Sequence, residues 1–206
     1  MVTQLLDAQN PQAIGEMAVY LQQGHLVILP TDTVYGVGAD AFNATAIARL
    51  YEAKQRPSEK GIPILLADMT DIWRVTTSIP PLAQNYIQQF WPGPLTLIVP
   101  KHPNLPANIS DNDGIAVRIP NCEVTRAVIR AAGGAVATSS ANRSGQPPAQ
   151  RVQEAWDQLE GWVTAVLDNG PSPGGIASTI VDCTGTVPRL VREGPISPKQ
   201  LALEPL

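Results

Sequence analysis

The sequence predicts an α/β fold built on a largely mixed sheet. Short apolar runs typical of strands alternate along the chain with segments that carry apolar residues at helical spacing. The chain has 206 residues, of which 44% are apolar and 16% charged, and this suffices for a sizeable buried core. The 20 prolines and 16 glycines stand singly between the apolar runs and predict many short elements. Because no repeat or linker divides the chain, we expect one domain over residues 1–206.

The first elements carry clear signals. Apolar residues recur at helical spacing over residues 11–23 and stop at Gly24, which is typical of a helix C-terminus. A strand is expected over residues 26–30. Asn43 is a good N-cap, so we expect a second helix to begin there and to end at Lys54.

The same criteria predict the remaining elements. Apolar runs predict strands over residues 62–67, 95–99, 115–119, 135–138, 163–167, 178–181 and 189–191. Capping residues and helical spacing predict a short helix after Asp68 and longer helices over residues 80–90, 123–132 and 152–161. Two polar, proline-containing segments, residues 101–113 and 139–150, are predicted to be loops.

The stretch LPTDTVYGVG at residues 29–38 predicts a binding loop. A buried strand stops at Pro30, and we expect the following residues to form a loop in which Gly36 and Gly38 allow close backbone approaches. Loops at the carboxyl ends of strands bind ligands in open α/β sheets, although a polar turn without a function is the alternative. No general-base histidine stands beside its hydrogen-bonding side chains, so the loop suits recognition better than nucleophilic attack. These side chains are Thr31, Asp32, Thr33 and Tyr35.

Composition and charge narrow the class of protein. A formal net charge of −4 argues against broad binding to phosphate backbones. No apolar run approaches the roughly 18 residues that span a bilayer, and the N-terminus lacks a signal-peptide pattern, so we expect a cytoplasmic protein. Cys122 and Cys183 lack metal-site spacing and are expected to be free thiols. The two histidines give little support to a histidine metal site.

Basic residues gather where the second predicted helix ends. Lys54 and Arg56 flank Gln55, and Lys60 follows in the same predicted loop. Arginine offers a planar fork to phosphate or carboxylate and lysine a compact charge, so the pair suits a polyphosphate. The alternative is a solvated basic helix end that interacts with the helix dipole.

Two further sets of polar residues follow predicted strands. The segment SSAN at residues 139–142 carries small hydroxyl and amide side chains that can bond phosphate oxygens or a base edge, or that can simply form a turn. Arg118 ends an apolar run and is a good carboxylate partner, although a structural ion pair is the alternative. The chain lacks the GxxxxGK[ST], GxGxxG, GxSxG and HExxH motifs, so any phosphate site must use dispersed residues.

Taken together, the motifs resemble the YrdC/Sua5 family. They occur in family order over residues 26–194, and their combination is far more specific than each part. They are PTDTVYGVGADA, KQRP followed by Lys60, FWPGPLTLIV, AVRIP, TSSANRSGQPP, STIVD and LVREG.

The resemblance implies a twisted sheet with flanking helices, a large concave basic cavity, and L-threonylcarbamoyladenylate synthase activity. L-Threonine, bicarbonate and ATP, the last with Mg²⁺, would give threonylcarbamoyl-AMP and pyrophosphate. The product would pass to a downstream threonylcarbamoyl-transferase complex for N6-threonylcarbamoyladenosine formation at tRNA position 37. A weak direct contact with tRNA or other RNA is left open.

The resemblance also implies roles for individual residues. Lys54 and Arg56 are expected to stabilise charge at the reacting phosphorus, and no protein metal site is expected. The residues expected to hold ATP are Arg56, Lys60, Ser140, Asn142 and Arg192. Those expected to hold threonine are Thr33, Arg118, Thr138 and Ser178.

The chain departs from the longer family members in two ways. Those members carry a histidine in the strand after KxRP, where this chain has only Ile64, Leu65 and Leu66. They also carry an extra C-terminal domain, so we expect this chain to correspond to the short, single-domain form.

Two other functions compete with the synthase. One is a carbamoyltransferase domain of the same fold, which makes a carbamoyl-adenylate from carbamoyl phosphate. The other is a non-catalytic module that binds double-stranded RNA or tRNA, against which the net negative charge counts.

Overall fold

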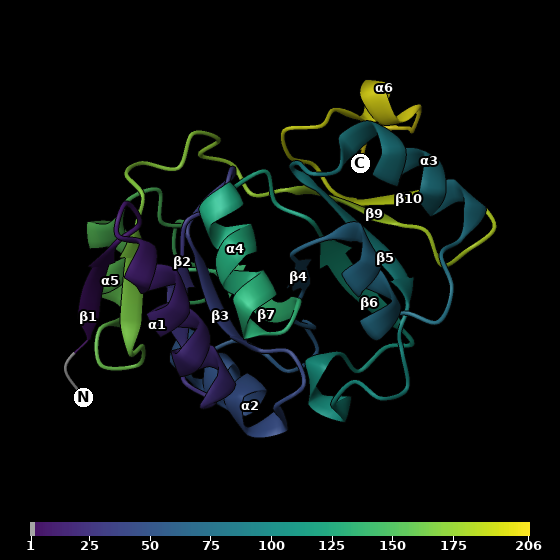
Figure 1. Ribbon diagram of the computed structural model, residues 1–206. Coiled ribbons are helices and arrows are strands. Elements are labelled where there is room, and N and C mark those ends of the chain that lie inside the picture. The colour runs from purple at the N-terminus through teal and green to yellow at the C-terminus, as the bar shows by residue number, and fades with distance from the viewer. Residues whose placement is uncertain (1–2) are drawn as a thin grey trace.

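The computed structural model describes residues 3–206, and these form one mixed sheet with helices on both faces (Figure 1). The strands are β1 Gln4–Asp7, β2 Val27–Leu29, β3 Gly36–Asp40, β4 Ile64–Leu66, β5 Leu95–Pro100, β6 Gly114–Arg118, β7 Ala135–Ser140, β8 Ala165–Asp168, β9 Thr179–Asp182 and β10 Arg189–Arg192. The helices are α1 Pro11–Gln22, α2 Ala44–Lys54, α3 Pro81–Phe90, α4 Glu123–Ala132, α5 Val152–Leu159 and α6 Pro198–Leu201, with 3-10 helices η1 Met69–Arg74 and η2 Ala107–Ile109.

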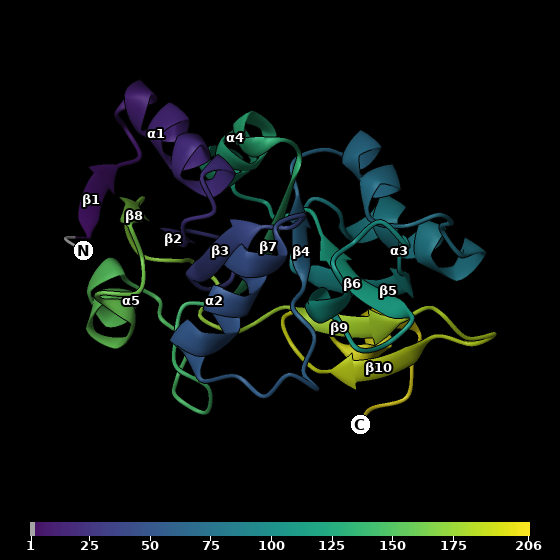
Figure 2. The same ribbon diagram turned by 90° about the horizontal axis from the view of Figure 1, so that it is seen from below.

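The strand order is β1-β8-β2-β3-β7-β4-β6-β5-β9-β10, with parallel and antiparallel neighbours. The prediction of a mixed α/β sheet is therefore confirmed. Strand β7 lies between β3 and β4 and is antiparallel to both, so it joins two parts of the chain that come much earlier in the sequence. Figure 2 shows β9 and β10 turning under the sheet, beneath β5 and β6.

Helices α1 and α4 lie together on one face of the sheet, and α2 and α5 lie on the other (Figure 2). Apolar residues of α1 and α4 pack against alternate residues of the strands below them, as the helical and strand periods require. Leu65 of β4 belongs to this apolar cluster and also faces a cavity beside it. The cavity therefore begins at the edge of the sheet area on which α1 and α4 pack.

The predicted loop at residues 30–38 is shorter than expected, because Gly36 and Gly38 lie in strand β3. A Cβ on Gly36 would stand 2.7 Å from Cγ2 of Thr138, and a Cβ on Gly38 would stand 2.9 Å from Cγ1 of Val136. Both contacts belong to the paired strand β7. The glycines thus serve close strand packing rather than a turn, and the prediction that they lie in the loop was wrong.

The other predicted elements are present with small differences at their ends. Asn43 caps α2 by accepting from the backbone N–H groups of Thr45 and Ala46, as expected for an N-cap. Strand β1 was not predicted, because three of its four residues are exposed and it lacks an apolar alternation. Helix α6 was missed because it has only four residues.

Two predicted loops are partly regular. Residues 101–113 contain η2, and β7 continues through Ser139 and Ser140 before the loop begins. Both cysteines are free, as predicted, with Cys183 buried and Cys122 half-buried. Within residues 3–206 no helix combines the length and apolar character needed to cross a membrane.

We expect Gly36→Ala to destabilise the fold, because the added methyl group meets Thr138 on the neighbouring strand. Overpacking of this kind costs roughly 1–3 kcal/mol of the free energy of unfolding. Urea denaturation measures the loss. Gly15→Ala is the matched control, because Gly15 lies within α1 with open space around it, and we expect it to stabilise by about 0.5–1 kcal/mol. Equal effects of both substitutions would contradict the packing role of Gly36.

Candidate active site

A cavity of about 840 Å³ opens beside the apolar cluster of α1 and α4. This volume is within the range usual for small-molecule sites. Its walls come from strands β3 to β7, β9 and β10, from the loop at residues 30–35 and from the segment 61–63. The cavity therefore joins segments from most of the length of the chain.

Alternate residues of three neighbouring strands form the floor of the cavity. Ile98 of β5 stands beside Ala116 of β6 and Asp182 of β9, and these form the middle row. Arg118 and the hydroxyls of Thr96 and Ser178 lie at one end of the floor, Ile98 and Ala116 lie in the middle beside Asp182, and Gly114 and Pro100 lie at the other end. The two ends lie about 13 Å apart along β6, at the usual rise per residue. The floor residues are Gly114, Ala116, Arg118, Thr96, Ile98, Pro100, Ser178, Ile180 and Asp182.

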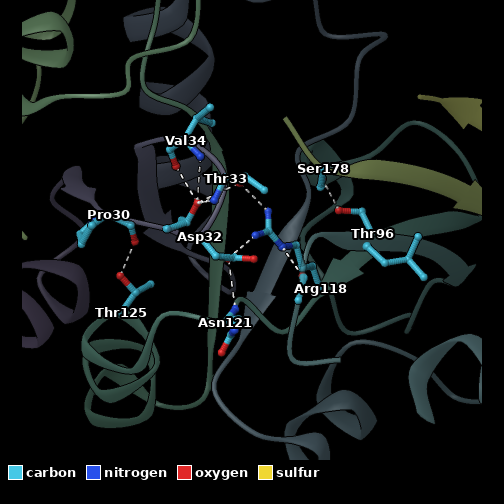
Figure 3. Close-up of polar contacts among 12 residues, drawn as sticks. Pro30, Asp32, Thr33, Val34, Thr96, Arg118, Asn121, Thr125 and Ser178 are labelled. Atoms are coloured by element: carbon cyan, nitrogen blue, oxygen red, sulfur yellow. Dashed lines mark hydrogen bonds and ion pairs between the residues drawn. The ribbon is translucent and has the colours of Figure 1, made fainter. Parts of the chain in front are cut away.

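Arg118 occupies the cationic end and is only 5% exposed (Figure 3). Its Nη2 pairs with Oδ1 of Asp32, its Nη1 donates to Oγ1 of Thr33 at 2.9 Å, and its Nε donates to the carbonyl of Gly93 at 2.9 Å. Burial lowers the pKa of Arg118, and the charge of Asp32 opposes that shift. A guanidinium has five N–H groups, so these three contacts leave two for a ligand.

The loop at residues 30–35 is held by its own hydroxyl groups (Figure 3). Oγ1 of Thr31 donates to the carbonyl of Val34 at 2.6 Å and accepts from the backbone N–H groups of Thr33 and Val34. Thr125 of α4 donates from Oγ1 to the carbonyl of Pro30 at 2.5 Å. The loop therefore presents Thr33 to the cavity in a fixed orientation.

Two more arginines face the cavity without an acidic partner. Arg56 donates to the carbonyls of Lys60 at 2.8 Å and Gly61 at 2.9 Å, and Arg192 donates to the carbonyl of Ser178 at 2.7 Å and 3.0 Å. Among residues 3–206, neither guanidinium forms an ion pair. Desolvation lowers the pKa of Arg192, and repulsion from Arg118 and Arg56 lowers it further. These uncompensated charges suit an anionic ligand.

Three hydroxyl-bearing residues of the predicted site also line the cavity. Oγ of Ser178 lies 2.7 Å from Oγ1 of Thr96 and accepts from Arg192 at 3.2 Å. Thr138 uses its hydroxyl hydrogen on the carbonyl of Val136 at 3.1 Å and can only accept from a ligand. Ser140 ends β7 at the cavity wall.

The structure does not bring every predicted residue to the cavity. Lys54 is 1% exposed and its Nζ is bonded to main-chain carbonyls, while Lys60 is exposed and Asn142 lies behind the wall. Gln55 separates Lys54 from Arg56 with a φ of 51°, so the two side chains diverge. The roles predicted for Lys54, Lys60 and Asn142 stay predictions, whereas direct contact is geometrically open to Arg56, Arg192, Ser140, Thr33, Arg118, Thr138 and Ser178.

Two residues that support the site escaped the sequence analysis. Asp32 was noted only as a loop residue, yet it pairs with Arg118, and Thr96 was hidden in an apolar strand although it pairs with Ser178. A hydroxyl at an inward position of the run Leu95–Pro100 is the signal that could have found Thr96.

No group of three or more His, Cys, Asp or Glu side chains that could hold a metal ion is present in residues 3–206. Mg²⁺ often binds through substrate phosphates, one or two carboxylates and water. The residues of this cavity therefore fit a magnesium ion that arrives with a polyphosphate, not one held by a protein cage.

A known protein family and several known proteins are similar to this chain in sequence. A family model named Sua5_yciO_yrdC and described as "Telomere recombination" matches residues 19–194. A Bacillus subtilis protein named threonylcarbamoyl-AMP synthase is 36% identical over 202 residues, which cover 97% of this chain and 58% of that protein. A Mycobacterium tuberculosis protein named putative threonylcarbamoyl-AMP synthase is 38% identical over 206 residues, which cover 98% of this chain and 94% of that protein.

A solved structure shares the fold closely. The structure described as P. abyssi Sua5 complexed with L-threonine superposes with a TM-score of 0.93 at 32% identity. The match covers 98% of this chain and 60% of that one. The chain thus spans about 60% of two of these relatives and nearly all of the mycobacterial one.

We expect Asp32→Asn to lower the free energy of unfolding by roughly 3 kcal/mol, because it leaves the buried Arg118 charge uncompensated. Glu123→Gln is the control, since Glu123 is 71% exposed and pairs with Arg130, which is 46% exposed and keeps its pair with Asp68. An exposed pair contributes less than about 1 kcal/mol. Urea unfolding of both variants measures the difference. Similar losses for the two would show that the Arg118 pair is no more important than a surface pair.

Proposed function

The chain belongs to the Sua5/YciO/YrdC family, and we propose that it is a threonylcarbamoyl-AMP synthase. It would join L-threonine, bicarbonate and ATP into threonylcarbamoyl-AMP and release pyrophosphate. The observation that carries the proposal is the cavity itself, where two unpaired arginines stand near a third that is fixed by Asp32 and Thr33. The names of relatives that are 36–38% identical over nearly the whole chain support the same reaction.

The Arg118 end of the cavity suits threonine. Arg118 keeps two N–H groups for the carboxylate, and the hydroxyls of Thr33, Thr138 and Ser178 are available for the polar side of the substrate. Leu65, in the strand where the longer members carry a histidine, lines this wall and adds an apolar surface. The threonine complex reported for P. abyssi Sua5, whose fold is closely similar, supports this assignment.

Arg56 and Arg192 suit the phosphates of ATP. Each has one edge of its guanidinium fixed on main-chain carbonyls, which leaves the other edge for anionic oxygens. Ser140 at the end of β7 offers a hydroxyl beside them. We retain Lys60 and Asn142 as proposed ATP contacts that need a change of side-chain conformation to reach the ligand. Mg²⁺ would accompany ATP and reduce the charge of its phosphates.

The reaction needs positioning and charge stabilisation rather than a covalent intermediate. The neutral amine of threonine adds to CO₂ derived from bicarbonate, and an oxygen of the resulting carbamate attacks the α-phosphorus of ATP. The bond from that phosphorus to pyrophosphate then breaks, and pyrophosphate leaves. Arg56 and Arg192 would stabilise the charge that develops on the phosphoryl oxygens, and removal of one such donor typically costs about 3 kcal/mol.

The proposed product determines the proposed partners. Threonylcarbamoyl-AMP would pass to a transferase complex that modifies the adenosine at tRNA position 37, and we propose that this occurs in the cytoplasm. The cavity is lined by four arginines and two aspartates in a chain of net charge −4, and we infer a locally basic site. This distribution favours a small anionic ligand over an extended RNA surface.

We predict that pyrophosphate release from ATP requires threonine and bicarbonate together, because the nucleophile exists only after they combine. A coupled pyrophosphate assay in bicarbonate-depleted buffer, with each substrate omitted in turn, measures this dependence. Release that persists without threonine would contradict the synthase. Release that needs carbamoyl phosphate instead would identify the carbamoyltransferase reaction.

We predict that the enzyme selects threonine mainly by its hydroxyl group. Serine loses only the methyl group and should lose roughly 1–3 kcal/mol in kcat/KM, whereas 2-aminobutyrate loses the hydroxyl and should be nearly inert. Steady-state kinetics with the three amino acids measure this order. If 2-aminobutyrate rivals threonine, the hydroxyls of Thr33, Thr138 and Ser178 do not recognise the substrate side chain.

A further inference from the structure

Lys54 is the last residue of α2 and one of the largest fully buried side chains in the protein. Its Nζ donates to the carbonyl of Ser140 and, at 2.6 Å, to the carbonyl of Asn142. The carbonyl of Lys54 accepts from the backbone N–H of Ser144 at 2.8 Å. One residue of α2 is therefore bonded to the last residue of β7 and to two residues of the segment that follows it.

Other contacts also hold the segment after β7: the backbone N–H of Ala141 donates to the carbonyl of Tyr35 at 2.8 Å, and the backbone N–H of Arg143 donates to Oε1 of Gln158 at 3.0 Å. Nδ2 of Asn142 donates to the carbonyls of Arg143 at 2.8 Å and Gln146 at 2.7 Å, which closes a turn. The residues of this turn, from Arg143 to Pro147, are exposed. Together with these contacts, the bonds from Lys54 to Asn142 and Ser144 anchor this exposed turn to the body of the protein, immediately after the serines that line the cavity.

The position of Lys54 does not suit direct contact with a ligand. The side chain is 1% exposed, it is not part of the cavity wall, and two of its three ammonium hydrogens are used by carbonyls. Arg56, two residues later, faces the cavity instead. Of the two basic residues in the Lys-x-Arg pair, Lys54 is therefore bonded inside the protein, and Arg56 is placed to contact a ligand.

We propose that Lys54 is a positioning residue, which fixes the segment 140–144 so that Ser140 faces the phosphates of ATP, and that it does not itself touch ATP. The identity of the ligand rests on the proposed function, but the support of the segment by Lys54 does not. Replacement of Lys54 by methionine leaves the carbonyl of Asn142 without its donor and removes one of the two donors to the carbonyl of Ser140, and a buried carbonyl is costly to leave unpaired.

Burial also changes the titration of Lys54. Desolvation lowers its pKa to about 7, and the nearby Arg56 guanidinium contributes to the same shift. A neutral amine keeps two hydrogens, enough for both carbonyls. Lys54 can therefore hold both carbonyls whether its amine is charged or neutral. A role in stabilising negative charge would be lost when the amine becomes neutral.

Hydrogen–deuterium exchange and ATP binding on the same variants test the proposal. In Lys54→Met, we expect amides 140–146 to exchange roughly tenfold faster without any ligand, and the Kd for ATP to rise by a similar factor. In Arg56→Met, which removes a proposed phosphate contact, the Kd should rise while exchange of residues 140–146 stays at the wild-type rate. Unchanged exchange in Lys54→Met, or faster exchange with unchanged ATP affinity, would overturn the proposal.

Leu21→Ala is the matched control for general loss of stability. Leu21 is buried in the cluster of α1 and is not part of the cavity wall, so its truncation should lower the melting temperature but change neither the exchange of residues 140–146 nor the Kd for ATP. If Leu21→Ala reproduces the effects of Lys54→Met, Lys54 supports only the global fold and the proposal is wrong.

The wild-type protein provides a second test if Lys54→Met does not fold. Reductive methylation followed by mass spectrometry should modify the exposed Lys60 rapidly and leave Lys54 unmodified, both with and without ATP. Modification of Lys54 in the free protein would overturn the proposal. This result does not depend on turnover, so it is separate from failure of the pyrophosphate assay, which would count against the synthase.

Discussion

The structure depends on the burial of one guanidinium group. Arg118 is almost inaccessible to solvent, and a buried charge costs several kcal/mol unless it is paired and hydrogen-bonded. Its nitrogens contact Asp32 and Thr33 of one loop and Gly93 of another, which are distant in the sequence. The cost of desolvation therefore requires these segments to meet at one point, and that point is also the cationic end of the cavity. The same electrostatic requirement governs the fold and the site.

The other cavity arginines are arranged on a different principle. Arg56 and Arg192 repel each other and have no acidic partner among residues 3–206, so their placement reduces stability in the absence of a ligand. Main-chain carbonyls fix one edge of each guanidinium and so limit its conformational freedom before any ligand binds. Donors that are already oriented need little reorganisation when charge develops on a substrate. Residues of functional sites commonly lower the stability of the fold in this way.

The sequence was sufficient for most helices and strands because their signals are local. Asn43 predicts the start of α2 by its own capping chemistry, and the apolar period predicts the buried face that follows. Gly36 was misplaced because the reason for a glycine there is Thr138, far along the chain. Lys54 and Arg56 were expected to act together, but the left-handed turn at Gln55 sends them in different directions. Spacing along a sequence does not specify such divergence. The alternation in the run Leu95–Pro100 places Thr96 on an inward face, but it does not show that a cavity lies there.

The position of β7 between β3 and β4 has a consequence for how the protein folds. Its pairings join residues that are distant in sequence, and non-local pairing slows folding because the connecting chain must lose entropy before the contacts form. The cavity needs these pairings and also Arg192 near the end of β10, so no early part of the folding chain contains a complete site. A ligand of the cavity then binds only the fully assembled sheet. By mass action, it protects every strand of the sheet at once.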